Sequence, residues 1–394
     1  MLRRIAVTLL LGLSVAAPGQ SVEPPAQRGW QISGLPALNF NADEGFGYGA
    51  IVQAYNYGNG GAKPYAYLIQ PLVFLTTKGR RDVSVFFDAP HLLPGDWRWG
   101  AYLGREQQLS TPYYGIGNAT IHDSTNERPP NPYYYRYGRV GIRFSTDLQR
   151  PVMGPLRVLV GVGTRTSRID DTPFDSGTTL LRVQTSGIGI PTKQATYLRS
   201  GLVFDTRDRE SGPSRGQWVE LLVQHAGKFA GGDYSFTRVT ATGRAYVSLT
   251  DRLVFAERVA VQNLSGASVP FYELSTIQGS FSDDEGLGGS GTVRGWPKNR
   301  FTGKGLMFAN QELRWRVSDF SLRSRPSALV LNGFVDAGRV WSTGLTTAGL
   351  LSDLHVGYGG GARLRYGQDF VVGLDVGHSK ESGAAIYLGL GYPY

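Results

Sequence analysis

The stretch Leu156-Arg157-Val158-Leu159-Val160-Gly161-Val162 decides the fold, because its residue types repeat with a period of two. Its even-numbered positions are all apolar, whereas Arg157 and Gly161 lie on the other side. Successive side chains of an extended strand point to opposite faces, so this pattern predicts a β-strand with one apolar and one polar face. Residues 140–144 and 385–394 alternate in the same way. No later stretch shows a comparable helical period.

Composition excludes several other classes of protein. The 394 residues include 54 Gly, 21 Tyr and 18 Phe, and 41% of the chain is hydrophobic, which argues against disorder. The one long apolar run, residues 5–17, is shorter than the ~20 residues of a membrane-spanning helix. Because cysteine is absent, disulfides and thiolate metal sites are impossible. The net charge of +9 comes from scattered arginines, so we expect no nucleic-acid partner.

The first residues are expected to direct export. Arg3 and Arg4 precede an apolar stretch and a small-residue end, which is the pattern of a secretory signal peptide over residues 1–19. Residues 20–29 would then be a short periplasmic segment before an outer-membrane barrel over residues 30–394. An exported chain without cysteine fits a Gram-negative outer membrane, where the hydrogen-bonded ladder of a barrel takes the place of disulfides.

Sixteen segments have the alternation of barrel strands. A tilted strand needs ~9–11 residues to cross a membrane, and most of the segments are this long. We therefore predict an all-β fold, a transmembrane antiparallel β-barrel of sixteen strands. The expected strands cover residues 30–40, 46–57, 64–76, 80–89, 96–106, 137–148, 154–168, 194–206, 216–228, 234–249, 252–263, 303–317, 327–339, 353–366, 368–378 and 383–394.

The connections indicate a barrel with both ends in the periplasm. The three longest connections are residues 107–136, 169–193 and 264–302. Counted from the first strand they are the fifth, seventh and eleventh connections. All three are odd-numbered, and the odd-numbered connections of an antiparallel barrel lie at the same end. Outer-membrane barrels have long outer loops and short periplasmic turns, a parity that a soluble sandwich has no reason to follow. Outer-membrane barrels carry a girdle of aromatic residues at the periplasmic rim. We expect this girdle to include Trp97, Trp99, Trp315, Tyr392 and Tyr394.

Charged residues of the strands are expected to face the lumen, since charges cannot face hydrocarbon cheaply. With the apolar face outward, the inward residues are Arg139, Arg143, Arg157, Arg199, Asp205, Glu220, Glu312, Arg314, Arg316, Asp336, Arg363 and Asp375. These residues either solvate a water-filled lumen and pair with one another, or a subset of them holds a long loop inside the barrel. Glu257 falls on the outward face, which predicts a bulge or a different register there.

Several motifs stand in order over roughly half of the chain. Val293, Arg294, Gly295 and Trp296 form a Val-Arg-Gly-aromatic motif in the long connection, residues 310–314 follow it, and residues 334–338 read Phe-x-Asp-x-Gly. Residues 205–216 precede them with two Asp, an Arg, a Pro and a Gly. These stretches resemble the loop, the two following strands and the periplasmic turn of the outer-membrane insertase superfamily, the BamA/TamA-like barrels also called bacterial surface antigens. The resemblance implies membrane protein assembly, protein translocation or lipid handling.

The resemblance also implies contacts and partners. In the family the loop arginine is tied to the aspartate of the Phe-x-Asp-x-Gly strand, which here implies Arg294 with Asp336, and Glu312 is a candidate second partner. Members usually carry periplasmic POTRA domains. Only about ten residues separate the expected cleavage site from the first strand, so we expect a short branch without these domains, whose role a periplasmic partner would supply.

The long connection 264–302 is expected to fold into the lumen. It far exceeds the usual ~4–6 residues and contains apolar side chains that need a surface to pack on. The barrel interior is the nearest such surface. Arg294 would enter this interior as a desolvated charge and require an anion, and Asp336 faces inward on the second strand after the loop. Gly295 would allow a tight turn, and Trp296 would pack against the wall.

The end of the chain resembles a C-terminal assembly signal of outer-membrane barrels. The residues that carry this resemblance are Tyr387, Gly389, Tyr392 and Tyr394. An ordinary last strand is the alternative interpretation. If the signal operates, the barrel assembly machinery is a partner during biogenesis, and outer-membrane lipids and lipopolysaccharide surround the assembled barrel.

No residues have the spacing of a catalytic, cofactor or metal site. The five His include no pair with metal-ligand spacing, and His378 and Ser379 are neighbours in a strand that point to opposite faces. Residues 283–285, all acidic, are either a calcium site or, more commonly, solvated loop acids. We therefore expect no enzyme. The first hypothesis is a BamA/TamA-type barrel whose seam between first and last strands opens. The second is a passive channel or structural barrel. A more distant third is an outer-membrane lipid hydrolase.

Overall fold

The structure, a computed structural model, describes residues 28–41, 44–60, 65–175, 177–187, 190–210, 212–367 and 370–394. Sixteen antiparallel strands close into one barrel, which confirms the predicted fold class. The expected signal peptide, residues 1–19, lies outside the described residues, as does most of the segment 20–29. The barrel strands are β1 (Trp30–Asn41), β2 (Gly45–Asn56), β3 (Tyr67–Thr76), β4 (Arg80–Leu93), β5 (Trp97–Pro112), β6 (Arg136–Met153), β7 (Leu156–Asp170), β8 (Lys193–Asp205), β9 (Gly216–Gly227), β10 (Ser235–Ser248), β11 (Leu253–Ser268), β14 (Gly305–Leu322), β15 (Arg325–Trp341), β16 (His355–Tyr366), β17 (Phe370–His378) and β18 (Ala385–Leu390).

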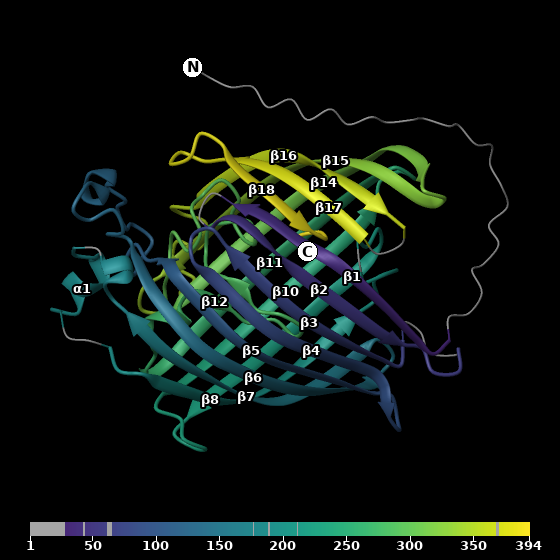
Figure 1. The fold of residues 1–394 in the computed structure, drawn as a ribbon, viewed down its shortest axis with the longest axis horizontal. Coiled ribbons are helices and arrows are strands. Elements are labelled where there is room, and N and C mark those ends of the chain that lie inside the picture. The colour runs from purple at the N-terminus through teal and green to yellow at the C-terminus, as the bar shows by residue number, and fades with distance from the viewer. Residues whose placement is uncertain are drawn as a thin grey trace.

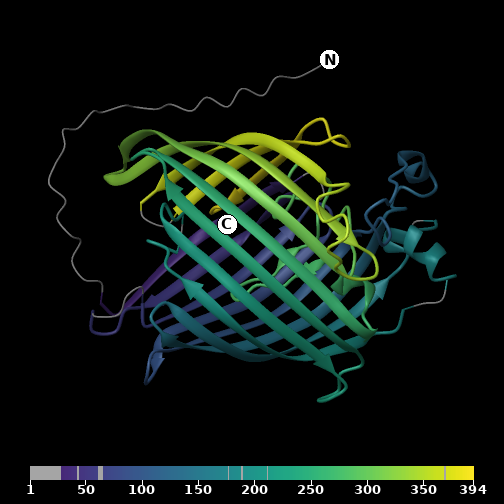
Figure 2. The same ribbon diagram turned by 180° about the vertical axis from the view of Figure 1, so that it is seen from behind.

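Each barrel strand pairs with the next one along the chain, and β18 returns to β1. The strands run obliquely around the wall, as Figures 1 and 2 show from opposite sides. The three long connections, residues 113–135, 171–192 and 269–304, leave the barrel at one end, and helix α1 (Leu180–Gln184) in the second of them marks that end at the left of Figure 1. We call this the loop end and the opposite one the turn end.

Short elements lie within the long connections. Residues Ser124–Glu127, Pro173–Asp175 and Phe271–Glu273 form short 3₁₀ segments. The two-residue strands β12 (Thr276–Ile277) and β13 (Asp284–Glu285) pair with each other inside the 269–304 connection, separate from the barrel sheet. Since β12 and β13 are not strands of the barrel, the barrel neighbour that follows β11 is β14.

Several strands end at residues other than those expected. β5 continues to Pro112, β6 to Met153 and β14 to Leu322, beyond the point where the apolar alternation stops. Backbone pairing persists there although the regular alternation of apolar and polar residues has broken down, so hydrophobic periodicity cannot mark these ends. In the opposite sense, β18 ends at Leu390, because Gly391 adopts a φ of 81° and turns the chain out of the ladder.

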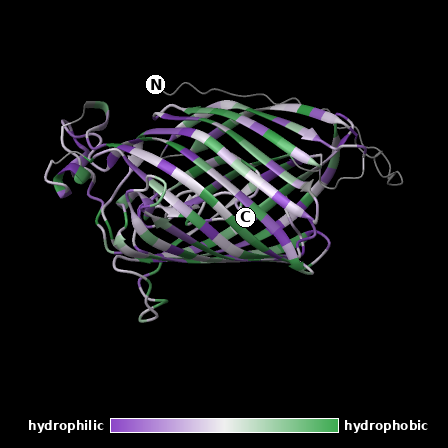
Figure 3. Cartoon of the chain, turned by 90° about the horizontal axis from the view of Figure 1, so that it is seen from below, coloured by the Kyte–Doolittle hydropathy of each residue, from purple (hydrophilic) through white to green (hydrophobic). Residues whose placement is uncertain are grey.

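The barrel wall has an apolar outer face and a charged inner face, visible as alternating green and purple along the strands of Figure 3. Seven of the charged residues expected to face inward are buried: Arg199, Glu220, Glu312, Arg314, Asp336, Arg363 and Asp375. Arg316 is half-exposed near the turn end and pairs with Asp319. Glu257 does lie on the outer face, where Gln311 donates a hydrogen bond to it at 3.4 Å. The register of β10 and β11 is regular around Glu257, so the expected bulge is absent from this stretch.

Aromatic residues gather at the turn end, but two of the five expected there, Tyr392 and Tyr394, lie elsewhere. Trp99 and Trp315 are 36% and 52% exposed on the outer face, and Trp97 lies two residues before Trp99 on the same face. Tyr394 was expected beside them, but it is only 6% exposed and lies in the lumen, where Arg314 approaches its ring to 5.3 Å. Tyr392 also contacts Arg314, at 4.5 Å. The turn at Gly391 redirects both tyrosines from the rim into the barrel.

The seam between β1 and β18 is short. β1 pairs with β2 along its whole length, from Trp30 to Asn41. In the described part of the chain, pairing with β18 covers Phe40 with Leu388 and Asn41 with Tyr387, near the loop end. The rest of β1 toward the turn end therefore has no ladder partner on that side among the described residues.

Candidate functional site: a loop anchored in the lumen

The 269–304 connection folds into the barrel and packs on the inner wall. Ile277, Leu287, Val293, Trp296 and Phe301 of the loop are each at most 2% exposed. They form one apolar cluster with wall residues of β11, β14 and β15. Burial of these side chains removes apolar surface from water at roughly 25 cal/mol per Å², which stabilises the folded-in position of the loop.

Arg294 is held at the centre of an ion cluster in the lumen. Its Nε and Nη2 donate to the two carboxylate oxygens of Asp336 at 2.7 and 3.0 Å, which is the bidentate geometry that guanidinium favours. Its Nη1 donates to Glu312 at 2.9 Å and to Asp375 at 3.2 Å. The guanidinium also lies 3.4 Å from the ring centre of Phe334. One loop side chain is thus tied to β14, β15 and β17.

Two further arginines balance the charge of this cluster. Arg314 donates to Glu312 at 2.8 Å, and Arg363 donates to Asp375 at 2.7 and 2.8 Å. Three cations therefore face three carboxylates, and we call these six residues the lumen cluster. Burial alone would lower the pKa of Arg294, but the facing carboxylates of Asp336, Glu312 and Asp375 raise it, so Arg294 stays charged.

Gly295 and Trp296 fit tightly beside Arg294. Gly295 adopts a φ of 95°, and a Cβ atom at this position would lie 2.5 Å from the carbonyl oxygen of His378. Its backbone N–H donates to the hydroxyl of Tyr387 at 3.0 Å, and Ser379 donates to its carbonyl at 2.9 Å. The indole of Trp296 donates to the carbonyl of Val356 at 3.0 Å. The motif therefore meets the wall from β16 to β18.

A second group of loop acids meets the opposite wall. Glu273 pairs with Arg238 at 2.8 Å and with Arg165 at 3.4 Å. Asp283 pairs with Arg143 at 2.9 Å and with Arg165 at 3.6 Å. These arginines lie on β6, β7 and β10. Hence the loop is fixed both to the C-terminal strands and to the middle strands, and it spans the lumen between them.

The loop acids are held ionised by their arginine neighbours. Burial alone would raise the pKa of Glu273, but Arg165, Arg238 and Arg139 outweigh it and lower the pKa to about 2. The same balance lowers the pKa of Asp283, where Arg143 and Arg165 are the main cations. The anchoring of this part of the loop therefore does not change around neutral pH.

The loop end carries further ion pairs of the loop. Lys298 pairs with Glu44, in the turn between β1 and β2, and with Glu285 at 2.5 Å. Arg300 pairs with Glu381 at 2.7 Å and donates to the carbonyl of Thr120 at 2.8 Å. The segment around Thr120 thus reaches over the barrel mouth. Gly117 of this segment forms an isolated antiparallel β-bridge with Thr302 of the loop.

The structure brings together most of the site residues named from sequence. Arg294, Asp336 and Glu312 meet in the lumen cluster, and Tyr387 contacts Gly295. Gly389 lies on the inner face of β18 between Tyr387 and the turn at Gly391. Sequence reasoning did not name Asp375 as a partner of Arg294, although its strand phase placed it inward. It also gave no role to Glu273 and Lys298, because these residues lie in an irregular loop. Without a regular alternation, the sequence does not indicate in which direction their side chains point.

The candidate enzyme and calcium residues make other contacts. His378 contacts the carbonyl of Gly383 at 2.8 Å, whereas Ser379 faces the loop, so these two residues form no catalytic pair. The acids at 283–285 pair with Arg143, Arg258 and Lys298, and the side chains of Asp284 and Glu285 are 34% and 44% exposed. Among the described residues no His, Asp and Glu group is arranged to hold a metal ion. In the same part of the chain, no helix is long and apolar enough to cross a bilayer.

Comparison with known proteins places the chain in a family. Residues 70–370 match the Omp85 superfamily domain. The structure resembles BamA from Haemophilus ducreyi lacking POTRA domains 1–3, with a TM-score of 0.58, 14% identity, and coverage of 93% of this chain and 70% of that one. It also resembles CdiB from Escherichia coli, with a TM-score of 0.58, 12% identity, and coverage of 93% and 64%.

The remaining comparisons bear on the extent of this likeness. CdiB from Acinetobacter baumannii gives a TM-score of 0.52 at 13% identity, with coverage of 93% of this chain and 60% of that one. The chain therefore spans less than two thirds of either CdiB chain, and at these identities the structural likeness concerns the fold. No curated protein matches in sequence. Since the family match covers most of the barrel, the chain belongs to the Omp85 superfamily.

Proposed function

We propose that this barrel resides in the outer membrane and handles membrane proteins, translocated proteins or lipids, with the β1–β18 seam as its opening. The observation that carries the proposal is the loop that spans the lumen. Arg294 ties this loop to β14, β15 and β17, while Glu273 and Asp283 tie it to β6, β7 and β10. The two walls cannot separate while both sets of contacts hold.

The short seam supports this assignment. A strand edge without a ladder partner presents free N–H and C=O groups to any extended segment that approaches it. In β1 this edge lies toward the turn end, below the pairing of Phe40 with Leu388. A client strand or a translocating chain could pair there. Release of the loop would let β18 move away from β1 and lengthen the free edge.

Partners follow from the same proposal. The barrel assembly machinery would insert the chain, guided by the segment from Tyr387 to Tyr394. Outer-membrane lipids and lipopolysaccharide would contact the apolar outer face, and a periplasmic partner would deliver clients to the turn end. An assembly role for the C-terminal segment is compatible with the observed lumenal position of Tyr394, because assembly precedes closure of the barrel.

A seam-locking experiment tests the proposal. Since the chain has no cysteine, Phe40→Cys with Leu388→Cys would introduce one disulfide across the seam. Leu38→Cys with Tyr48→Cys is the matched control, because it joins the outward pair of β1 and β2. In liposomes, the wild-type barrel should accelerate folding of a client barrel, the oxidised seam variant should lose this acceleration, and the control should keep it. Equal acceleration by the oxidised seam variant and its control would contradict the proposal.

A passive channel is the second candidate, and one observation favours it. A cavity of about 260 Å³ lies between residues 280–283 of the loop and wall residues of β4, β5, β6 and β8. Its lining includes Arg98, Arg143, Arg199, Asp88 and Asp147, which suit water and ions. Ion conductance without any acceleration of client folding, unchanged by the seam disulfide, would select this function.

A further inference from the structure

We propose that the outward face of β4, β5 and β7 binds the phosphorylated headgroup of an outer-leaflet glycolipid. The residues of this basic patch are Arg81, Arg105 and Arg168, together with Gln107. The proposal rests on the outer-membrane location proposed above, but it concerns the outside of the wall, whereas the loop and the lumen cluster lie inside.

The register of the strands brings the basic patch together. Arg81 of β4 pairs with Gln107 of β5, and Arg105 pairs with Val83. Arg81 and Arg105 are therefore diagonal neighbours on one face, ~7–8 Å apart at Cα and within reach of two long side chains. Gln107 in turn pairs with Val140 of β6, and Val140 pairs with Arg168 of β7, so Arg81 and Arg168 stand at the two ends of one row across four strands.

The arginines of the basic patch differ from those of the lumen in having no acidic partner. Arg81, Arg105 and Arg168 are all exposed. Within the described ranges none of the three forms an ion pair, and Arg105 donates only to Gln107, at 3.3 Å. Asp170 is the nearest acid along β7, and it accepts hydrogen bonds from the backbone and hydroxyl of Thr172 at 3.0 and 3.4 Å. Three guanidinium groups are left to meet an external anion.

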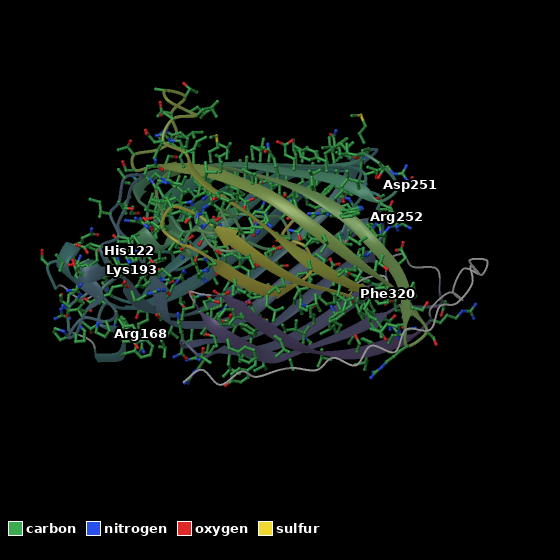
Figure 4. All side chains as sticks on the ribbon, turned by 90° about the horizontal axis from the view of Figure 1, so that it is seen from above. His122, Arg168, Lys193, Asp251, Arg252 and Phe320 are labelled. Atoms are coloured by element: carbon green, nitrogen blue, oxygen red, sulfur yellow. The ribbon has the colours of Figure 1, made fainter. Side chains whose placement is uncertain are left out.

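The basic patch lies at the upper border of the apolar outer band. Toward the turn end from it, the outward residues include Val83, Val85 and Leu103, which are 57%, 44% and 55% exposed. Figure 4 shows Arg168 at the loop end, with His122 and Lys193, far from Asp251, Arg252 and Phe320 at the turn end. An outward arginine is disfavoured among lipid tails but favoured at the level of headgroups. Because the long loops face the exterior, this level belongs to the outer leaflet.

The chemistry and width of the basic patch select the ligand. Guanidinium donates two parallel hydrogen bonds to a phosphate, so arginine is the side chain suited to phosphorylated headgroups. Arg81 and Arg168 are three strand spacings apart, which is roughly 14 Å. A headgroup with one phosphate would engage only one end of this row. A glycolipid that carries two phosphates on its sugar backbone would engage both ends.

Lipid titration of the purified full-length barrel tests the proposal. The probes are diphosphoryl lipid A, its monophosphoryl form and phosphatidylglycerol, each added in neutral detergent and followed by native mass spectrometry. The triple variant R81Q/R105Q/R168Q should bind diphosphoryl lipid A at least tenfold more weakly than the wild type. The matched control is Arg150→Gln, which removes an outward arginine near the turn end of the same wall. The guanidinium carbon of Arg150 lies 5.5 Å from the ring centre of Trp97, away from the basic patch. The affinity of this control variant should equal that of the wild type.

The outcomes separate this proposal from the proposed function. Heat-modifiable migration in gels verifies that the triple variant is folded. Equal binding of diphosphoryl lipid A by the folded triple variant and the wild type would overturn the proposal, as would phosphatidylglycerol binding as tightly as diphosphoryl lipid A. Because the triple variant leaves the loop and the seam intact, it should still accelerate client folding. A barrel that binds lipid A through these residues but never accelerates folding would refute the proposed function alone.

Discussion

Removal of the Arg294 side chain should free the loop from the C-terminal wall. Asp336 is 0% exposed, and its ion pair is with Arg294. In Arg294→Ala, two arginines would face three carboxylates, and Asp336 would keep only neutral donors, the amide of Asn310 at 2.8 Å and the backbone N–H of residue 294 at 3.1 Å. Breaking a buried pair costs roughly 3–5 kcal/mol, because the remaining charge is stranded. A loss of this size weakens the docking of the motif, so we expect the loop around residue 294 to leave the wall more often.

The double variant makes the magnitude testable. Asp336→Ala should also destabilise by roughly 3–5 kcal/mol, because Arg294 then lacks its bidentate partner. Removal of both partners strands no charge from this pair, so Arg294→Ala with Asp336→Ala should cost clearly less than the sum of the single changes. Arg316→Ala is the control, since its pair with Asp319 is 38% and 49% exposed and an exposed pair contributes about 0–1 kcal/mol.

Limited proteolysis and single-channel conductance measure this effect. In both single variants, proteases should cut within residues 269–304 faster than in the wild type, and conductance should rise. The control variant should resemble the wild type in both assays. Strict additivity of the two single changes, or a loop as resistant in Arg294→Ala as in the wild type, would show that this buried ion pair does not fix the motif.

Three further predictions follow from the described contacts. Gly295→Ala should loosen the loop as well, since a Cβ atom would lie 2.5 Å from the carbonyl oxygen of His378, and protease sensitivity would report it. The contribution of Glu273 to loop docking should be lost as pH falls from the ordinary glutamate value of 4.5 toward about 2, because its lowered pKa stabilises the docked loop above that range. Glu273→Gln should therefore reduce the acid-induced increase in protease sensitivity. A tag after Ser124 should be accessible on intact cells and one at Gly60 should not, and the reverse pattern would contradict the assigned orientation.

Sequence predicted the barrel well because its signal is distributed over many residues. Period-two alternation and the parity of connection lengths each recur around the whole wall, so errors at single strands do not change the outcome. The same strand phase placed Asp336 and Glu312 in the lumen. Their contact with Arg294 could be anticipated because a lumenal strand phase and a family resemblance pointed to the same residues.

The remaining contacts depend on features that have no periodic signal. Glu273 and Asp283 lie in an irregular loop, so nothing in their spacing indicates which arginines they meet. The position of Tyr394 depends on a single positive φ at Gly391, which turns the chain inward after the last paired residue. Strand ends were missed for a related reason, because hydrogen bonding continues where the apolar alternation has stopped.

If the loop holds the seam closed, a distance measured across the seam should change when the loop is released. Leu38 of β1 and Leu390 of β18 are 45% and 40% exposed on the outer face, and cysteine introduced at both positions can carry spin labels in a chain without other cysteine. In lipid nanodiscs, the wild-type barrel should give one short distance between the labels. Arg294→Ala should add a longer population, as β18 leaves β1. An unchanged single distance in Arg294→Ala would show that the loop does not hold the seam closed.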